Sequence, residues 1–105
     1  MSSTAVTELP QPRREDVRFE AVLHALSDPV RLHIVRALAA SAEPRACGTL
    51  GLPVTKSTAT HHFRVLREAG VISQYDEGRA RINTLRRGDL EARFPGLLNT
   101  VLGAT

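Results

Sequence analysis

Hydrophobic and polar residues follow a helical period over residues 55–69, which is the most regular pattern in the chain. At about 100° per residue, Ala59, Phe63 and Leu66 fall within one narrow arc and predict a buried face. Thr55 is a suitable N-cap, because its hydroxyl can accept a hydrogen bond from the first turn. We therefore expect one helix of about four turns, which ends where the chain reaches a glycine.

The opposite face of this helix carries side chains that can donate hydrogen bonds. Its members are Ser57, Thr60, His61 and Arg64. A solvated helix more often carries interleaved Glu and Lys four residues apart, and this face has that spacing only in Arg64 and Glu68. Small hydroxyl residues in the first turn also allow a close approach to phosphate, which the helix dipole favours. The pattern therefore predicts a recognition helix for nucleic acid.

Two further helices are predicted before the recognition helix. Residues 15–26 contain an apolar stripe at helical spacing, made by Phe19, Val22, Leu23 and Leu26. Asp28 and Pro29 then end the first helix and begin a second, since Asp caps a helix and Pro fits its first position. The second helix runs to about residue 40, with an apolar face made by Val30, Ile34, Val35 and Leu38 and a polar face made by Arg31, His33 and Arg36.

A short apolar segment, Ala46–Leu50, separates the second helix from the recognition helix. Gly51 and Pro53 bound it, and we expect a brief third helix that leads through a turn into the recognition helix. Two helices joined by a short turn, the second with an exposed polar face, form a helix-turn-helix.

After residue 70 the period changes from helical to β-like. Residues 71–75 and 80–85 have β character and flank a glycine-containing turn at residues 76–79, so we expect a hairpin with Ile72 and Ile82 facing the core. A hairpin directly after a helix-turn-helix makes a winged helix, whose hairpin tip can reach DNA beside the recognition helix. The candidate wing contacts are Arg79 and Arg81.

The C-terminal segment predicts a surface for a second subunit. Residues 88–93 can form a helix that Pro95 and Gly96 interrupt, and residues 97–102 resume as one or two apolar turns. These turns are more apolar than a free end normally is, and with the stripe of the first helix they would make a dimer surface. A two-fold axis there would place two recognition helices about one DNA turn apart.

The positive charge of the chain is concentrated around the recognition helix and the hairpin. The whole chain of 105 residues has a formal net charge of +3. Residues 56–87 contain seven Lys or Arg against three acids, a net of +4, whereas the remainder has seven against eight, a net of −1. Neutralisation of DNA phosphates requires a basic segment of this kind at the recognition helix.

Residues 1–14 contain Ser, Thr, Gln and Pro without an apolar period, and we expect a flexible tail. Arg13 and Arg14 at its end leave open a role as an extra DNA-contacting arm. The winged-helix domain then covers residues 15–102, with dimerisation through its first and last helices.

Composition and motifs argue against several other functions. No apolar run approaches about 18 residues, so we expect no membrane span. The single Cys excludes an intramolecular disulfide and fits the reducing cytoplasm. The chain has no G-x-S-x-G motif, no glycine-rich phosphate loop and no H-E-x-x-H motif, and we expect that it is not an enzyme.

Three segments closely resemble the ArsR/SmtB family of bacterial winged-helix repressors. They are ALSDPVRLHIV at residues 25–35, STATHHFRVLREAGVI at residues 57–72 and EGR at residues 77–79. The two long motifs are highly specific together, because they occur in the right order before a predicted hairpin. The resemblance covers about residues 17–102.

The resemblance implies a cytoplasmic repressor of transcription that binds an inverted-repeat DNA operator as a homodimer. The base-reading positions of the family fall on the exposed face already selected by periodicity, Ser57, Thr60, His61 and Arg64. Basic side chains around that face are the candidates for phosphate contacts, Lys56, Arg67, Arg79 and Arg81. The expected fold is mainly α with a small β-hairpin: four helices, the hairpin and a fifth helix, in a dimer.

The family usually senses a small signal, most often a metal ion, but both familiar metal sites are missing here. Cys47 is the only thiol before the recognition helix, and residues 87–105 contain no His or Cys. A nickel or zinc site would need a non-standard ligand set, with His24, His33 and Cys47 as candidates. A metal-responsive sensor is therefore one alternative. The other is a winged-helix interaction module that acts with a regulatory partner protein.

Overall fold

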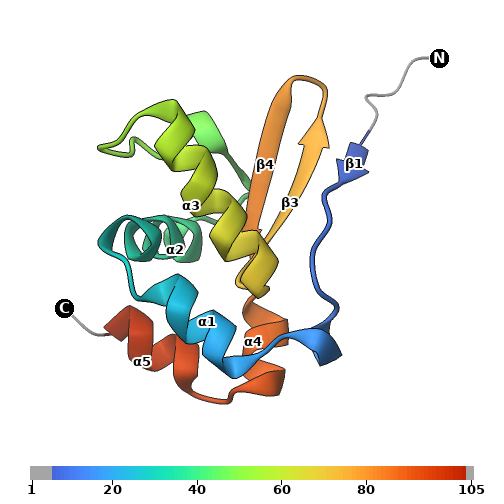
Figure 1. The fold of residues 1–105 in the computed structure, drawn as a ribbon, viewed down its shortest axis with the longest axis vertical. Helices are drawn as coiled ribbons and strands as arrows, with labels where there is room; N and C mark the ends of the chain where they lie inside the picture. Colours follow the sequence, from blue (N-terminus) through green and yellow to red (C-terminus); the bar gives the residue numbers. More distant parts are fainter. Residues whose placement is uncertain (1–5, 104–105) are drawn as a thin grey trace.

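The predicted recognition helix is α3 (Lys56–Ala69) in the computed structural model, which describes residues 6–103. Thr55 caps it, since the Thr58 amide donates to Thr55 Oγ1 at 3.3 Å. Gly70 ends it in the left-handed conformation at φ 86°. Local sequence thus fixes both ends of this helix, and both agree with the prediction. In Figure 1, α3 runs diagonally between α2 and the hairpin.

The remaining helices form the body of the domain beside and below α3 (Figure 1). They are α1 (Phe19–Leu26), α2 (Pro29–Ala40), α4 (Arg87–Arg93) and α5 (Leu97–Gly103). The predicted interruption at Pro95 and Gly96 separates α4 from α5. None of the helices in residues 6–103 is both long and apolar enough to cross a membrane.

The first helix begins later than the sequence predicted. Residues 14–16 form a separate 3-10 turn, η1 (Arg14–Asp16), and α1 begins only at Phe19. Between the two, Val17 adopts an extended conformation and is buried, with 1% of its surface exposed. Burial of this side chain in the core therefore takes precedence over a continuous helix.

The brief helix predicted at residues 46–50 is replaced by a strand and a single turn. β2 (Arg45–Ala46) pairs with β4, and η2 (Cys47–Thr49) is a 3-10 helix. Pairing with the sheet extends the backbone at Ala46, which leaves too few residues for an α-helix before Gly51. The turn element of the helix-turn-helix is therefore short, and Leu50 anchors it in the core.

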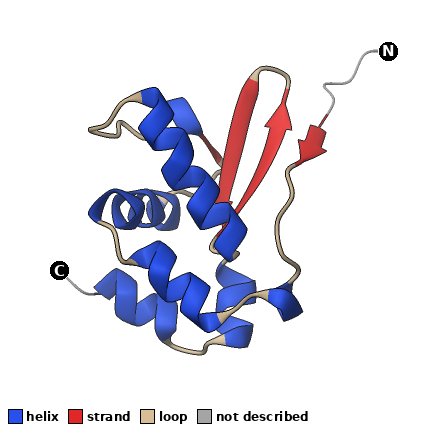
Figure 2. Cartoon of the chain, in the orientation of Figure 1, coloured by secondary structure: helices blue, strands red, loops and turns tan. Residues whose placement is uncertain are grey.

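The hairpin consists of β3 (Ile72–Glu77) and β4 (Ala80–Leu85). Glu77 pairs with Ala80, so the turn is shorter than predicted and contains only Gly78 and Arg79. Gly78 has φ 61°, a value that favours glycine in a tight hairpin turn. The full strand order is β1-β3-β4-β2, and Figure 2 shows the hairpin projecting from one edge of the helical body.

The prediction that Ile82 faces the core is wrong. Ile72 is fully buried and pairs with Leu85, and cross-strand partners lie on the same face of a sheet. That register puts Ile82 on the other face, opposite Tyr75. A polar pair, Gln74 and Asn83, takes the buried face between the strands, with Gln74 Nε2 donating to Asn83 Oδ1 at 2.7 Å.

The prediction of a tail without secondary structure is wrong for residues 6–14; residues 1–5 lie outside the described part of the chain. β1 (Val6–Glu8) pairs antiparallel with β3, and Val6 lies opposite Glu77. Residues 9–12 continue along the sheet, where the Leu9 amide donates to the Gln74 carbonyl at 3.2 Å. The free edge of β3 supplies the backbone partners that the sequence pattern could not reveal.

Candidate nucleic-acid interface

The polar face of α3 is exposed along its length. The predicted base-reading side chains are all exposed: Ser57, Thr60, His61 and Arg64. Lys56, at the first position of the helix, is exposed as well. Within residues 6–103, the side chains of Lys56 and Arg64 have no hydrogen-bond or ion-pair partner. Both cations are therefore available for a ligand outside the chain.

The hydroxyl groups in the first turns of α3 already make local hydrogen bonds. Thr60 Oγ1 donates to the Lys56 carbonyl at 2.9 Å, so its remaining capacity is to accept. An acceptor in the major groove suits the exocyclic amino groups of adenine and cytosine. Thr60 therefore differs from Arg64, which can only donate.

Arg31, which the sequence pattern predicts on a polar face, is buried and fixes α3 against α1 and α2. Arg31 is only 7% exposed, and it donates through Nε to the Ala25 carbonyl at 2.6 Å. Its Nη1 lies 3.1 Å from His62 Nδ1, which must accept because an arginine can only donate. Arg31 thus joins the end of α1 to the buried side of the recognition helix.

Asp28 completes this joint at the start of α2. Its Oδ1 accepts from the Val30 amide at 2.8 Å and from the Arg31 amide at 3.1 Å. Partial burial raises the pKa of Asp28, but the two amide hydrogen bonds outweigh that effect and hold it below its usual range. Asp28 is also 3.9 Å from His62 Nδ1.

The two predicted wing contacts have different surroundings. Arg79 is exposed in the hairpin turn and has no polar partner within residues 6–103. Arg81 forms a two-pronged ion pair with Asp76, at 2.8 and 3.1 Å. This pair lowers the pKa of Asp76 and raises that of Arg81. Arg79 is therefore the wing cation that a phosphate can reach without breaking an existing contact.

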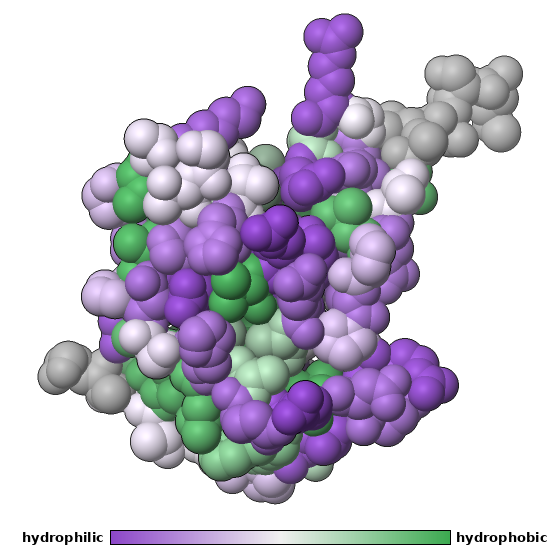
Figure 3. All heavy atoms as spheres, viewed as in Figure 1, coloured by the Kyte–Doolittle hydropathy of each residue, from purple (hydrophilic) through white to green (hydrophobic). Residues whose placement is uncertain are grey.

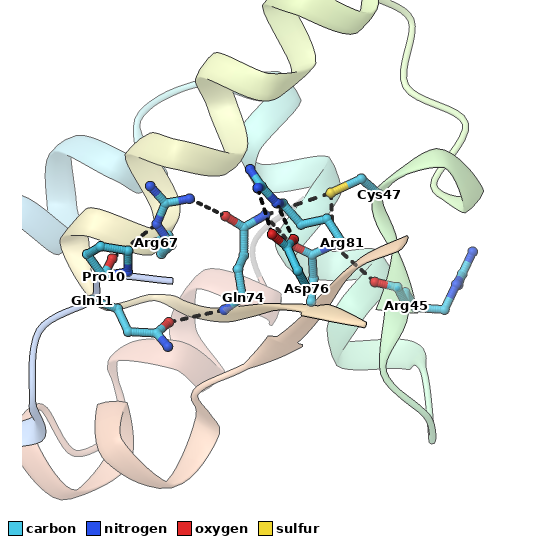
Figure 4. A network of polar contacts seen from close by, with 9 residues as sticks. Pro10, Gln11, Arg45, Cys47, Arg67, Gln74, Asp76 and Arg81 are labelled. Carbon is cyan, nitrogen blue, oxygen red and sulfur yellow. Dashed lines mark hydrogen bonds and ion pairs between the residues drawn. The ribbon is translucent and has the colours of Figure 1, made fainter. Parts of the chain in front are cut away.

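Arg67, a predicted phosphate contact, lies among protein groups rather than on the open face. Its Nε donates to the Pro10 carbonyl at 3.1 Å and its Nη1 to Gln74 Oε1 at 2.7 Å. Figure 4 shows Arg67 between the N-terminal segment and Gln74 of the hairpin, with Arg81 on the other side of Gln74. Arg67 therefore holds the N-terminal segment, α3 and the hairpin together, a role that sequence periodicity gave no sign of.

The three candidate metal ligands do not form one site within the chain. Among residues 6–103, no three His, Cys, Asp or Glu side chains are grouped so that they could hold a metal ion. Cys47 Sγ accepts from Asn83 Nδ2 at 3.2 Å, whereas His33 Nε2 faces the Leu50 carbonyl at 3.4 Å. His24 is exposed on α1. A nickel or zinc site remains a prediction that would need ligands from a second subunit.

The apolar stripe of α1 divides into a buried and an exposed half. Val22 and Leu26 belong to the core, but Phe19 and Leu23 are 47% and 44% exposed. The Phe19 ring packs against Phe94, with centroids 5.2 Å apart. Apolar residues of α5 extend this surface, and Figure 3 shows apolar atoms gathered over the lower end of the molecule, where α1 and α5 lie.

Comparison with known proteins connects this geometry to a family. Residues 26–75 match the family model described as a helix-turn-helix domain. The chain is also 37% identical over 82 residues to the uncharacterized HTH-type transcriptional regulator YceK of Bacillus subtilis (strain 168). That alignment covers 76% of this chain and 82% of the relative. The matched segment contains all of α2 and α3 and runs into β3.

Proposed function

Because this chain belongs to the helix-turn-helix family of transcriptional regulators, we propose that it is an ArsR-type repressor. In this proposal a cytoplasmic homodimer binds an inverted-repeat operator and blocks transcription from the promoter that the operator overlaps. The dimer forms through α1 and α5, and each subunit places α3 in a major groove.

The exposed donor and acceptor face of α3 is the observation that carries this proposal. It presents uncommitted cations beside small hydroxyl side chains, and the buried joint around Arg31 fixes the orientation of the helix. A rigid helix with an exposed polar face is what base reading in the major groove requires. The basic segment around the helix supplies the attraction for phosphate.

The contacts separate into two groups by chemistry. Base edges are read by Ser57, Thr60, His61 and Arg64, and phosphates are bound by Lys56 and Arg79. Arg67 and Arg81 stabilise the wing and act on phosphates through the field of their charge, since two donors of each guanidinium are already bound to protein acceptors. This division revises the sequence-based expectation that all four basic residues hold phosphates directly.

An Arg64→Ala variant should lose about 1 to 3 kcal/mol of binding free energy on its own operator, because it removes a bidentate base contact. The loss on a scrambled duplex should be much smaller. Both affinities can be measured by fluorescence anisotropy at one fixed salt concentration. Equal losses on the two duplexes would mean that Arg64 binds backbone rather than bases.

An Arg79→Ala variant should weaken binding to the operator and to the scrambled duplex by similar factors, because a phosphate contact is independent of sequence. The slope of log K against log salt should fall by about one, the value for one lost phosphate contact on duplex DNA. Glu77→Gln is a matched control at the same end of the hairpin, since it removes one negative charge where Arg79→Ala removes one positive charge. An unchanged slope in Arg79→Ala would remove the wing tip from the phosphate contacts.

A further inference from the structure

A cavity of about 700 Å³ lies between α3, the segment before it and the hairpin. This volume is within the usual range for sites that bind small molecules. The cavity begins at Cys47 and Gly48 in η2 and extends to Arg81 in β4. It is therefore built from the turn, the recognition helix and the wing of the winged helix-turn-helix.

The walls of this cavity carry an excess of positive charge. No Asp or Glu lines it, and its cations are Lys56, Arg64, Arg67 and Arg81. Only Arg81 has a carboxylate partner among these four in the described part of the chain. Arg67 donates to two neutral oxygens through Nε and Nη1, which leaves its Nη2 for another acceptor. The electrostatics therefore favour an anionic occupant.

The other walls of the cavity are apolar. They are contributed by Leu52, Val54, Ala59 and Phe63. A phosphate backbone gains nothing from such a surface, because its hydrated oxygens are not stabilised by aliphatic and aromatic groups. An organic anion with an apolar body gains from both kinds of wall.

We propose that this cavity binds a small organic anion, an apolar body that carries one carboxylate or sulfonate group, and that the bound anion excludes DNA. The second part rests on the proposed function. Lys56, Thr60 and Arg64 line the cavity and are also the DNA contacts proposed above. An anion held by Arg64 and Arg67 therefore competes with the operator for the same side chains, and its binding releases the repressor.

The first test uses 8-anilinonaphthalene-1-sulfonate, whose fluorescence rises in an apolar site. We expect saturable binding of this dye to the full chain. N-phenyl-1-naphthylamine lacks the sulfonate, and we expect it to bind with an affinity about tenfold lower or less. Labelled operator should displace the sulfonate dye, and the dye should raise the apparent Kd of the operator. The single cysteine adds a second readout, since bound dye should slow alkylation of Cys47 in the cavity wall.

A Gly48→Leu variant separates the cavity from the DNA contacts. Gly48 lines the cavity, and a Cβ added there meets no atom within 4 Å, so a larger side chain can begin at this position without a clash. We expect dye binding to weaken about tenfold as cavity volume is lost, while operator affinity stays unchanged. Gly88→Leu is the matched control, because a Cβ there is equally unhindered and lies outside the cavity.

Dye binding that Gly48→Leu leaves unchanged would overturn the proposal, since the dye would then occupy another surface such as the exposed stripe of α1. Simultaneous binding of dye and operator would overturn the exclusion of DNA. Failure of the proposed function gives a different result: no selective operator binding, with Gly48→Leu still weakening the dye. That result would support the first part of the proposal, that the cavity binds an organic anion. It would contradict the second part, that the bound anion releases the protein from DNA.

Discussion

A Leu23→Glu variant is expected to be monomeric and to bind its operator about 100-fold more weakly than the parent chain. Leu23 is 44% exposed on the stripe of α1 that we assign to the dimer interface, and a carboxylate there would be desolvated against its symmetry mate. Loss of the dimer removes the contact between the second subunit and its half-site. In the dimer this contact forms intramolecularly once the first half-site is bound. Sedimentation analysis measures the oligomeric state, and anisotropy measures operator affinity.

Leu23→Met is the control at the same position, because it keeps the apolar surface and a similar volume. This variant should remain dimeric and bind the operator as the parent does. The thermal unfolding of both variants should show a folded domain, since Leu23 lies outside the buried core. A Leu23→Glu chain that stays dimeric would show that the subunits meet through another surface.

A Gly70→Ala variant should lose about 2 to 5 kcal/mol of unfolding free energy, from left-handed strain and overpacking together. Gly70 ends α3 at φ 86°, where an L side chain is strained. A Cβ there would also lie 2.6 Å from Val17 Cγ2, and that valine is fixed in the core. Urea unfolding at one protein concentration measures the loss, because stability of a dimer depends on concentration.

Gly88→Ala is the matched control for this prediction. Gly88 lies within α4, and a Cβ there meets no atom within 4 Å. The same substitution should therefore raise stability slightly, by about 0.5 to 1 kcal/mol, because alanine favours a helix over glycine. A Gly70→Ala chain as stable as the parent would mean that the segment around Val17 moves away at little cost.

Elements whose signals are local in sequence were predicted well. Thr55 and Gly70 define the ends of α3 through contacts within a few residues, and Asp28 and Pro29 start α2 in the same way. Capping chemistry and helical period depend on neighbours along the chain, so the sequence contains them directly. The interruption between α4 and α5 follows from the same local rules.

Features that depend on distant partners could not be predicted. β1 forms because β3 offers an unpaired edge about seventy residues further along, and three residues carry no usable period of their own. The helical period predicts Arg31 on a polar face, because nothing in its helix shows that His62 and the end of α1 lie beside it. The orientation of Ile82 failed for a related reason, since a one-residue error in register exchanges the two faces of a strand.

The candidate interface shows the same division. Helical period alone selected the exposed face that contains Ser57, Thr60 and Arg64. Period could not show that Arg67 holds the Pro10 carbonyl or that Arg81 is paired with Asp76, because charge in the sequence does not reveal where a side chain is already bound.

The most direct test of the account is anisotropy of the full chain on labelled DNA from its own upstream region, beside a scrambled duplex of the same composition. Salt is fixed throughout, and the titration is repeated with nickel, with zinc and with a chelator. We predict tight binding to the upstream duplex, at least about 1,000-fold stronger than to the scrambled one. Equal affinity for the two duplexes under every condition would contradict the account and favour a winged-helix module that binds a partner protein.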